Sequence, residues 1–124
     1  LEDRLSREII GAAIEVHRHL GPGLLESAYE TALAHELGLR GIAVRRQVLL
    51  PVSYKGMCLD DGYRIDLLVE DVVLVEVKAV AGLLPIHEAQ LLTYLKFADK
   101  RLGLLLNFHG ATMRDGTRRV VHRL

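Results

Sequence analysis

The chain has 124 residues, of which 50% are apolar, and its 16 Lys and Arg balance its 16 Asp and Glu. This is the size of one domain, expected over residues 1–124, with enough apolar surface to fold without a disulfide or a structural metal. The charge balance excludes a generally basic coat for nucleic acid, while the single cysteine, Cys58, excludes a disulfide framework or a zinc site of several thiolates and fits a reduced cytoplasmic compartment.

Two helices are predicted before residue 42. The first begins near Asp3 or Ser6 and ends at the turn 21–23, and the second runs from Leu24 to Arg40, where Gly41 is placed to stop it. Each has apolar positions at helical spacing, which we expect to face a core. They are Leu5, Ile9, Ala12, Ala13, Val16 and Leu20 in the first, and Leu25, Ala28, Tyr29, Ala32, Leu33 and Leu37 in the second.

The remaining chain predicts strands, interrupted by one helix. Three successive strands are expected over residues 44–54, 63–69 and 72–79, followed by a helix from Pro85 to about Lys100 and a buried strand over residues 102–108. The turn signals are Lys55-Gly56, Asp60-Asp61-Gly62, Glu70-Asp71 and Asp115-Gly116, the last expected to be a hairpin turn leading to an edge strand over residues 118–123. The order ααβββαβ(β) predicts an α/β (α+β) fold, with a mixed central sheet of about four to five strands flanked by helices.

Charged residues interrupt two of the most apolar strands. If the turn at Glu70-Asp71 centres a hairpin, Asp66 lies opposite Glu76, with Cβ atoms about 5 Å apart. Glu76 and Lys78 are two residues apart, so their side chains share one face of the sheet. Charges among apolar neighbours must be paired or must bind something. The pattern alone leaves two interpretations open, a functional site and an ion pair from Lys78 to Glu76 or Asp66.

Two helical motifs add polar groups to this set. Glu26 follows the turn 21–23 at the start of the second helix, where a carboxylate also suits the helix dipole. Gln90 and Tyr94 are four residues apart and share a helix face, with His87 one turn earlier as a donor at the edge of a site. Each motif by itself is more typical of an ordinary surface or packing role.

Together these residues resemble the GxxExxY protein family, a compact branch of the PD-(D/E)XK nuclease-like superfamily. Gly23, Glu26 and Tyr29 spell the family's motif, and the similarity extends over residues 5–121 and includes the stretch 84–91. The resemblance implies a restriction-endonuclease-like core of order α-β-β-β-α-β with one helix added in front. Ile65 replaces the proline of the superfamily's name, whereas Lys78 is retained, which favours an active site.

The resemblance also implies the roles of the site residues. Asp66 and Glu76 would hold a divalent metal, joined by Glu26, while Gln90 and Tyr94 would complete the site, as in the recombination-exonuclease branch. Oxygen ligands of this kind, to which the Val77 carbonyl would add one, suit Mg²⁺ or Mn²⁺. Such a metal would activate a water and polarise the phosphate. Lys78 would orient that water, help to deprotonate it, or stabilise the developing negative charge, and the sequence leaves these three roles open.

The expected function is therefore metal-dependent cleavage of nucleic acid, with DNA favoured over RNA. A non-catalytic module that binds nucleic acid or protein on the same fold, and a hydrolase of another phosphate substrate, remain alternatives. Because the chain is neutral, binding would draw on a homodimer or an accessory protein. The scarcity of aromatic residues argues against a stacking platform for single strands. No apolar run reaches the about 18 residues of a membrane span, and the first residues lack the features of a signal peptide, so no membrane association is expected.

Overall fold

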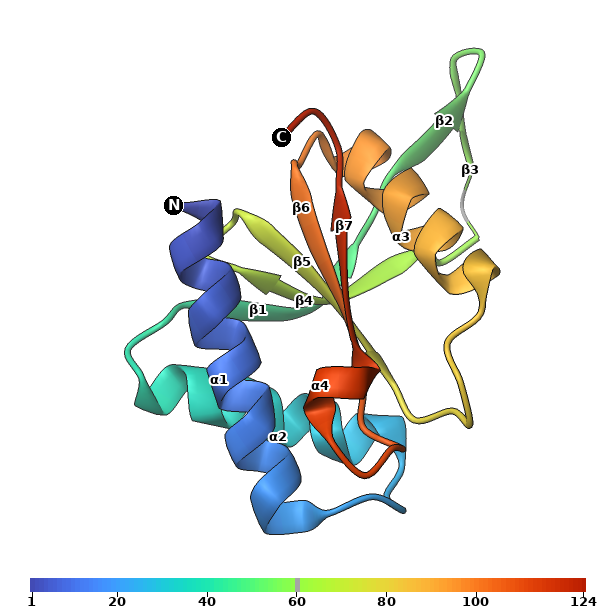
Figure 1. Ribbon diagram of the computed structural model, residues 1–124. Coiled ribbons are helices and arrows are strands. Elements are labelled where there is room, and N and C mark those ends of the chain that lie inside the picture. Colours follow the sequence, from blue (N-terminus) through green and yellow to red (C-terminus); the bar gives the residue numbers. More distant parts are fainter. Residues whose placement is uncertain (60) are drawn as a thin grey trace.

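A computed structural model describes residues 1–59 and 61–124 and shows a five-stranded mixed sheet flanked by helices (Figure 1). The strand order is β1-β4-β5-β6-β7, with all neighbours antiparallel except β5 and β6, which are parallel and are joined by α3. The elements are α1 (Glu2–Leu20), α2 (Glu26–Leu39), β1 (Val44–Leu49), β2 (Val52–Tyr54), β3 (Met57–Leu59), β4 (Arg64–Val69), β5 (Val73–Lys78), α3 (Pro85–Ala98), β6 (Leu102–Asn107), α4 (Met113–Gly116) and β7 (Thr117–Val121). The predicted α+β class and mixed sheet are confirmed and are consistent with a restriction-endonuclease-like core.

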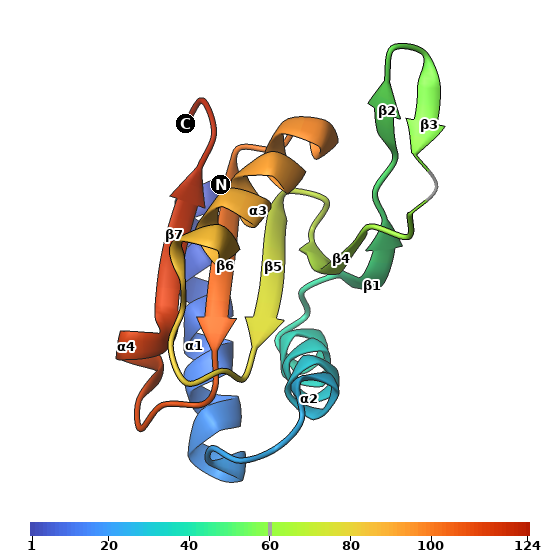
Figure 2. The same ribbon diagram turned by 90° about the vertical axis from the view of Figure 1, so that its right-hand side faces the viewer.

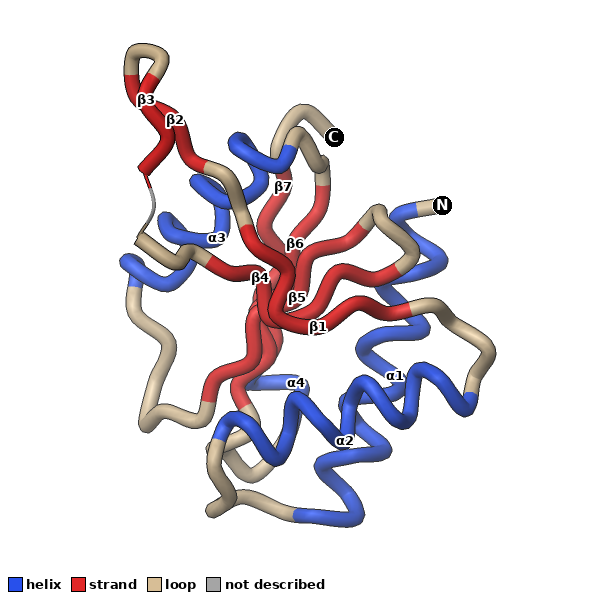
Figure 3. The backbone as a smooth tube through the Cα atoms, turned by 180° about the vertical axis from the view of Figure 1, so that it is seen from behind, coloured by secondary structure: helices blue, strands red, loops and turns tan. Residues whose placement is uncertain are grey.

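The helices cover the two faces of the sheet unequally. Helices α1 and α2 pack on one face, where they share a large buried cluster with β4, β5 and β6 (Figure 2). Helix α3 packs on the opposite face over β6 and β7, and a smaller cluster lies beneath it (Figure 3). Within the described residues, no helix combines the length and the apolar character that crossing a bilayer requires.

The hairpin of β4 and β5 has the predicted register. Three residues, Glu70 to Val72, separate the paired Val69 and Val73. Glu70 and Asp71 have φ values of 52° and 57°, and the Val72 amide donates to the Val69 carbonyl at 2.9 Å, which closes the tight turn. Leu67 pairs with Val75 and Val69 with Val73, so the next position along the strands sets Asp66 opposite Glu76. The local turn chemistry thus brings the two carboxylates together.

Helix α3 lies unusually close to the sheet. A Cβ atom placed on Gly103 in β6 would lie 2.9 Å from three side-chain atoms of Leu91, which is itself fully buried in α3. Any side chain at this position would therefore require Leu91 to shift. With glycine at residue 103, Leu91 packs directly on the backbone of β6.

Part of the predicted architecture is wrong at the sheet edge. The strand expected over residues 44–54 is divided at Leu50-Pro51, because Leu50 turns into the core and Pro51 has no amide hydrogen for a ladder. Beyond that break, β2 and β3 form a separate hairpin with its turn at Lys55-Gly56, which projects from the sheet (Figure 2). The turn predicted at Asp60-Asp61-Gly62 begins at Asp60, which lies outside the described residues.

Several local predictions also need correction. Leu20 and Leu25 are 42% and 77% exposed, because both lie at helix ends beyond the sheet. Ser6 does not cap α1, which begins at Glu2, but is buried within it. Asp115 and Gly116 do not form a hairpin turn. They belong to the short helix α4, whose cap is the Thr112 hydroxyl, which accepts a hydrogen bond from the Asp115 amide.

Candidate metal and phosphate site

The side chains of Asp66 and Glu76 replace the backbone ladder where β4 and β5 part. The Asp66 amide donates to Glu76 Oε1 at 3.3 Å, and the Val77 amide donates to Asp66 Oδ2 at 2.8 Å. Each carboxylate is therefore oriented by the other strand's backbone rather than by a cation. The convergence predicted from the hairpin register is observed.

Glu76 is the most perturbed of these groups. Its side chain is buried within the sheet, and burial, together with the negative charge of Asp66, raises the pKa of Glu76 from 4.5 to about 8. Lys78 opposes this shift, yet no carboxylate of residues 1–59 and 61–124 lies within the 4.0 Å of a salt bridge from its ammonium. The ion pair considered as a structural role for Lys78 is therefore not formed among these residues. The site has two carboxylates and a deficit of positive charge.

Glu26 reaches the same strand end from the opposite face of the sheet. It is the first residue of α2, and its Oε2 accepts a hydrogen bond from the Ala79 amide at 3.0 Å, just beyond β5. Tyr29 holds the turn that leads into this helix. Its hydroxyl donates to the Gly21 carbonyl and accepts from the Leu24 amide, while its ring stacks on Phe108 at 4.6 Å between centroids.

Gly23 completes this arrangement, because its φ of 108° suits only glycine. The spacing Gly23, Glu26, Tyr29 thus encodes a turn, the carboxylate that follows it, and the aromatic side chain that fixes the turn. Sequence analysis gave Tyr29 a place in the core and in the family motif, but no contact with the turn. Its spacing from Gly23 was the signal that could have revealed the second role.

Gln47 is a site residue that sequence analysis missed. It has a φ of 50°, rare for a residue with a side chain, and it interrupts the β1–β4 ladder opposite Asp66. Its amide nitrogen donates to Asp66 Oδ1 at 3.2 Å and to Glu30 Oε1 at 2.6 Å. Glu30 is buried and pairs in turn with Arg46 at 3.0 Å. This chain of contacts fixes the orientation of Asp66. Strained backbone conformations like that of Gln47 are found most often at functional sites.

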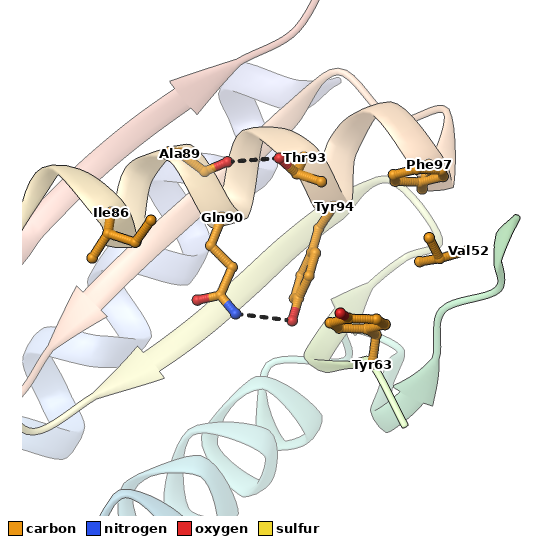
Figure 4. A pocket seen from close by; sticks show the side chains of 8 residues that line it. All are labelled: Val52, Tyr63, Ile86, Ala89, Gln90, Thr93, Tyr94 and Phe97. Carbon is orange, nitrogen blue, oxygen red and sulfur yellow. Dashed lines mark hydrogen bonds between the residues drawn. The ribbon is translucent and has the colours of Figure 1, made fainter. Parts of the chain in front are cut away.

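Gln90 and Tyr94 lie side by side on α3, as their spacing predicts. The Gln90 amide donates to the Tyr94 hydroxyl at 3.1 Å (Figure 4). Partial burial and then the nearby charge of Glu76 raise the pKa of Tyr94, which places this hydroxyl close to the carboxylates. His87, expected as a donor at the edge of the site, uses Nδ1 to accept from the Leu84 amide and so caps α3.

Four of the basic residues near the edges of the sheet are paired with carboxylates. Arg45 and Lys100 both contact Asp71, at 3.2 and 3.6 Å, Arg46 contacts Glu30, and Arg119 contacts Asp3 at 2.7 Å. These pairs hold the edges of the sheet and the first turn of α1. These four residues therefore act in ordinary ion pairs of the protein surface.

The donor set fits a divalent cation in its chemistry, although it is not a ready-made cage. Among the described residues, no three Asp, Glu, His or Cys side chains are grouped closely enough to form a metal site. Asp66 and Glu76 are in contact, whereas Glu26 lies against the Ala79 amide. Glu76 is buried and Asp66 half-buried, and a carboxylate pair of this kind with no salt-bridge partner among these residues has the oxygen donors that a hard cation requires.

Comparison with known proteins gives one family. A model described as the PD-(D/E)XK nuclease superfamily matches residues 3–120, nearly the whole chain. A search of curated proteins found no match, and neither did a search of solved structures. The matched range contains every element of the sheet and all of the polar residues described above.

Proposed function

The chain belongs to the PD-(D/E)XK nuclease superfamily, and we propose that it is a metal-dependent phosphodiester hydrolase acting on nucleic acid, with DNA favoured over RNA. The observation that carries this proposal is the pair formed by half-buried Asp66 and buried Glu76, which has a lysine two residues beyond Glu76 and no carboxylate partner for that lysine among the described residues. We further propose that the chain falls in the GxxExxY branch and acts in the cytoplasm. The Gly23–Glu26–Tyr29 turn supports the first, and the exposed, free Cys58 supports the second.

The metal ligands we propose are the carboxylates of Glu26, Asp66 and Glu76 and the carbonyl of Val77, with Mg²⁺ or Mn²⁺ as the ion. Such an ion, when bound, lowers the pKa of a water and neutralises charge on the phosphate. The chain's own part is orientation. Asp66 is held between the Val77 amide and Gln47, and Glu26 by the Ala79 amide, so both carboxylates keep oxygen lone pairs free for a ligand.

The remaining groups act on the phosphate and the water. Lys78 lies on the same face as Glu76, where its ammonium can stabilise the negative charge that develops on the phosphate. The Gln90 amide can accept from the attacking water and donate to a phosphate oxygen, and the Tyr94 hydroxyl can donate to the phosphate or the sugar. Their mutual hydrogen bond positions both before substrate arrives.

Metal binding is the first test. Titration calorimetry with Mg²⁺ and with Mn²⁺ should give millimolar or tighter binding, and either ion should raise the melting temperature by linkage. Asp66→Asn should abolish both effects, while Glu15→Gln, on α1 over the other face of the sheet, should leave them unchanged. Cleavage is then measured on a panel of single- and double-stranded DNA and RNA. Absence of any metal effect in the parent protein would contradict the proposal.

One observation favours the alternative of a binding module. The three carboxylates do not form a metal cluster among the described residues, since Glu26 stands apart from the other two. A module of this kind would bind nucleic acid or protein without metal and would tolerate Asp66→Asn. The same titration and panel therefore decide between the two functions.

A further inference from the structure

An apolar groove opens directly beside the proposed phosphate-binding groups. It encloses about 410 Å³ between α3 and the start of β2 and β4, with walls that include Val52, Tyr63, Ile86 and Phe97. Gln90 and Tyr94 line it as well, so the groove and the proposed site share two side chains. We propose that this groove binds an unpaired nucleobase next to the reacting phosphate, which makes single-stranded nucleic acid the substrate class. This inference rests on the proposed function.

Aromatic residues are few in this chain, but they are concentrated in the groove. The chain has four Tyr and two Phe, and three of these six line this one space. Tyr63 meets Tyr94 edge to face at 6.3 Å, while Tyr63 and Phe97 remain 38% and 44% exposed (Figure 4). Exposed aromatic faces at the rim of an apolar pocket suit a flat heteroaromatic ligand, because every base has a π face that stacks.

The position of the groove suits a base attached to the reacting nucleotide or its neighbour. Tyr63 precedes Asp66 by three residues of extended chain, about 10 Å along the strand. On the helix side, the Gln90 and Tyr94 side chains extend side by side from α3, with Tyr94 next to Tyr63 (Figure 4). Burial and then the charge of Glu76 raise the pKa of Tyr94, which links this end of the groove to the carboxylates. A strand whose phosphate lies at the carboxylates would therefore bring a base to the aromatic rings.

The charge distribution favours recognition through bases. The net charge is zero, and Arg45, Arg46, Lys100 and Arg119 are already paired with carboxylates. Phosphate contacts dominate the binding of duplexes, whose bases are stacked inside the helix. Stacking needs no cation, but it needs a base that is free of its partner. An apolar aromatic groove on a neutral protein is consequently matched to a single strand.

A tryptophan reporter tests occupancy of the groove directly. The chain has no tryptophan, so Phe97→Trp places a single indole in the groove, while Leu39→Trp places one at the exposed end of α2 as a matched control. Fluorescence is titrated in EDTA, so that cleavage plays no part, with DNA and RNA 12-mers, the DNA duplex, and an abasic 12-mer. We expect the single strands to quench Phe97→Trp, and neither the abasic strand nor the duplex to do so. Leu39→Trp should not respond.

Loss of the rings tests their contribution to affinity. Phe97→Ala and Tyr63→Ala should each weaken binding of a labelled single strand by about 5- to 150-fold, the range measured for stacked bases. Leu39→Ala should have no effect, and the abasic strand should bind the parent and the variants alike. Melting temperatures within a few degrees of the parent would show that the variants are folded. The DNA and RNA arms decide which sugar is preferred.

Two binding results would overturn the groove proposal: equal quenching of Phe97→Trp by the abasic and the normal strand, or unchanged affinity in both alanine variants. A third is a sedimentation result in which the parent is a dimer and Phe97→Ala a monomer, because the groove would then be a contact between two copies of the chain. Cleavage with Mg²⁺ or Mn²⁺ is assayed separately. Stacking without cleavage would contradict the nuclease function alone, and cleavage that ignores Phe97 and Tyr63 would contradict the groove alone.

Discussion

The two faces of the sheet differ in how completely they are covered. On the α1 and α2 face, alternate residues of three strands, such as Leu67, Val75 and Leu104, are fully buried in one continuous apolar cluster. The α3 face has one long helix, a smaller cluster and an open groove beside it. The perturbed Glu76 lies on this second face, near Tyr94. One face is built for packing, and the other keeps polar groups and empty space within reach of a ligand.

This difference shows how a small neutral domain can stay folded although it buries the carboxylic acid of Glu76. The free energy that stabilises the fold comes mainly from the closed face, since burial contributes roughly 25 cal/mol per Å² of apolar surface. The α3 face can then retain a group that opposes folding, Glu76 with its raised pKa. Each of the following predictions breaks or sharpens this contrast.

The largest effect is expected from the closed face. Leu104→Ala and Leu105→Ala alter neighbouring, fully buried residues of β6 that point to opposite faces. Leu104→Ala should cost about 2–5 kcal/mol of unfolding free energy, and Leu105→Ala a value near the low end, because α3 can settle toward the sheet. Urea unfolding gives both values. Equal costs in the two variants would argue that the faces are equally rigid.

Lys78→Ala should reverse that pattern, with a large loss of activity and little loss of stability. If Lys78 stabilises charge in the transition state, its removal should lower single-turnover cleavage by about 100- to 1000-fold. Mg²⁺ binding and the melting temperature should stay close to the parent values. Lys100→Ala, which breaks only an exposed pair with Asp71, is the control and should cleave normally. If Lys78→Ala cleaves at the parent rate, Lys78 has no part in catalysis and its role is structural.

Gln90→Ala and Tyr94→Phe should have intermediate effects. Each removes one partner of the hydrogen bond on α3 and should slow cleavage by about 10- to 100-fold, with a double variant slower by less than the product of the two. Tyr54→Phe removes a hydroxyl from the projecting hairpin and serves as the control. If melting temperature and activity fell in proportion, both residues would belong to helix packing instead.

The last expected effect is a pH dependence of stability in the metal-free protein. The unfolded chain releases the Glu76 proton near pH 4.5, while burial and Asp66 hold the pKa of Glu76 at about 8 in the folded state. Between these values the folded protein binds the additional proton, so stability should fall as pH rises through this interval. Glu76→Gln, which stays neutral, should remove this part of the slope. Thermal melts in EDTA at several pH values, compared between parent and variant, measure the difference.

Local signals in the sequence predicted the centre of the site but not its support. The turn at Glu70-Asp71 fixed the register, so Asp66 and Glu76 could be placed opposite each other from the sequence, and Gln90 and Tyr94 from helical spacing. The contacts of Gln47 with Glu30 and Asp66 join residues 17 and 19 positions apart. They depend on a left-handed backbone angle at a non-glycine residue, which no local pattern announces.

The same limit explains the errors in the fold. Leu25 has helical spacing but lies 77% exposed, because its helix begins beyond the edge of the sheet. The Asp115-Gly116 pair has the composition of a hairpin turn, yet the Thr112 hydroxyl caps a helical turn there instead. In both cases the residue type was compatible with two structures. Tertiary position decided between them.

The space between α3 and the sheet at Gly103 is too small for even one methyl group unless Leu91 moves. The strand that holds Gly103 has no polar residue of the site, yet it supports Leu91, which adjoins Gln90 in the sequence. A methyl group at residue 103 would displace the Leu91 side chain, and any movement of α3 that relieved this contact would also move the neighbouring Gln90 and Tyr94 away from the strands. The spacing of α3 from β6, rather than any charge, then helps to set the distance between the Gln90 and Tyr94 side chains and the carboxylates of the strands.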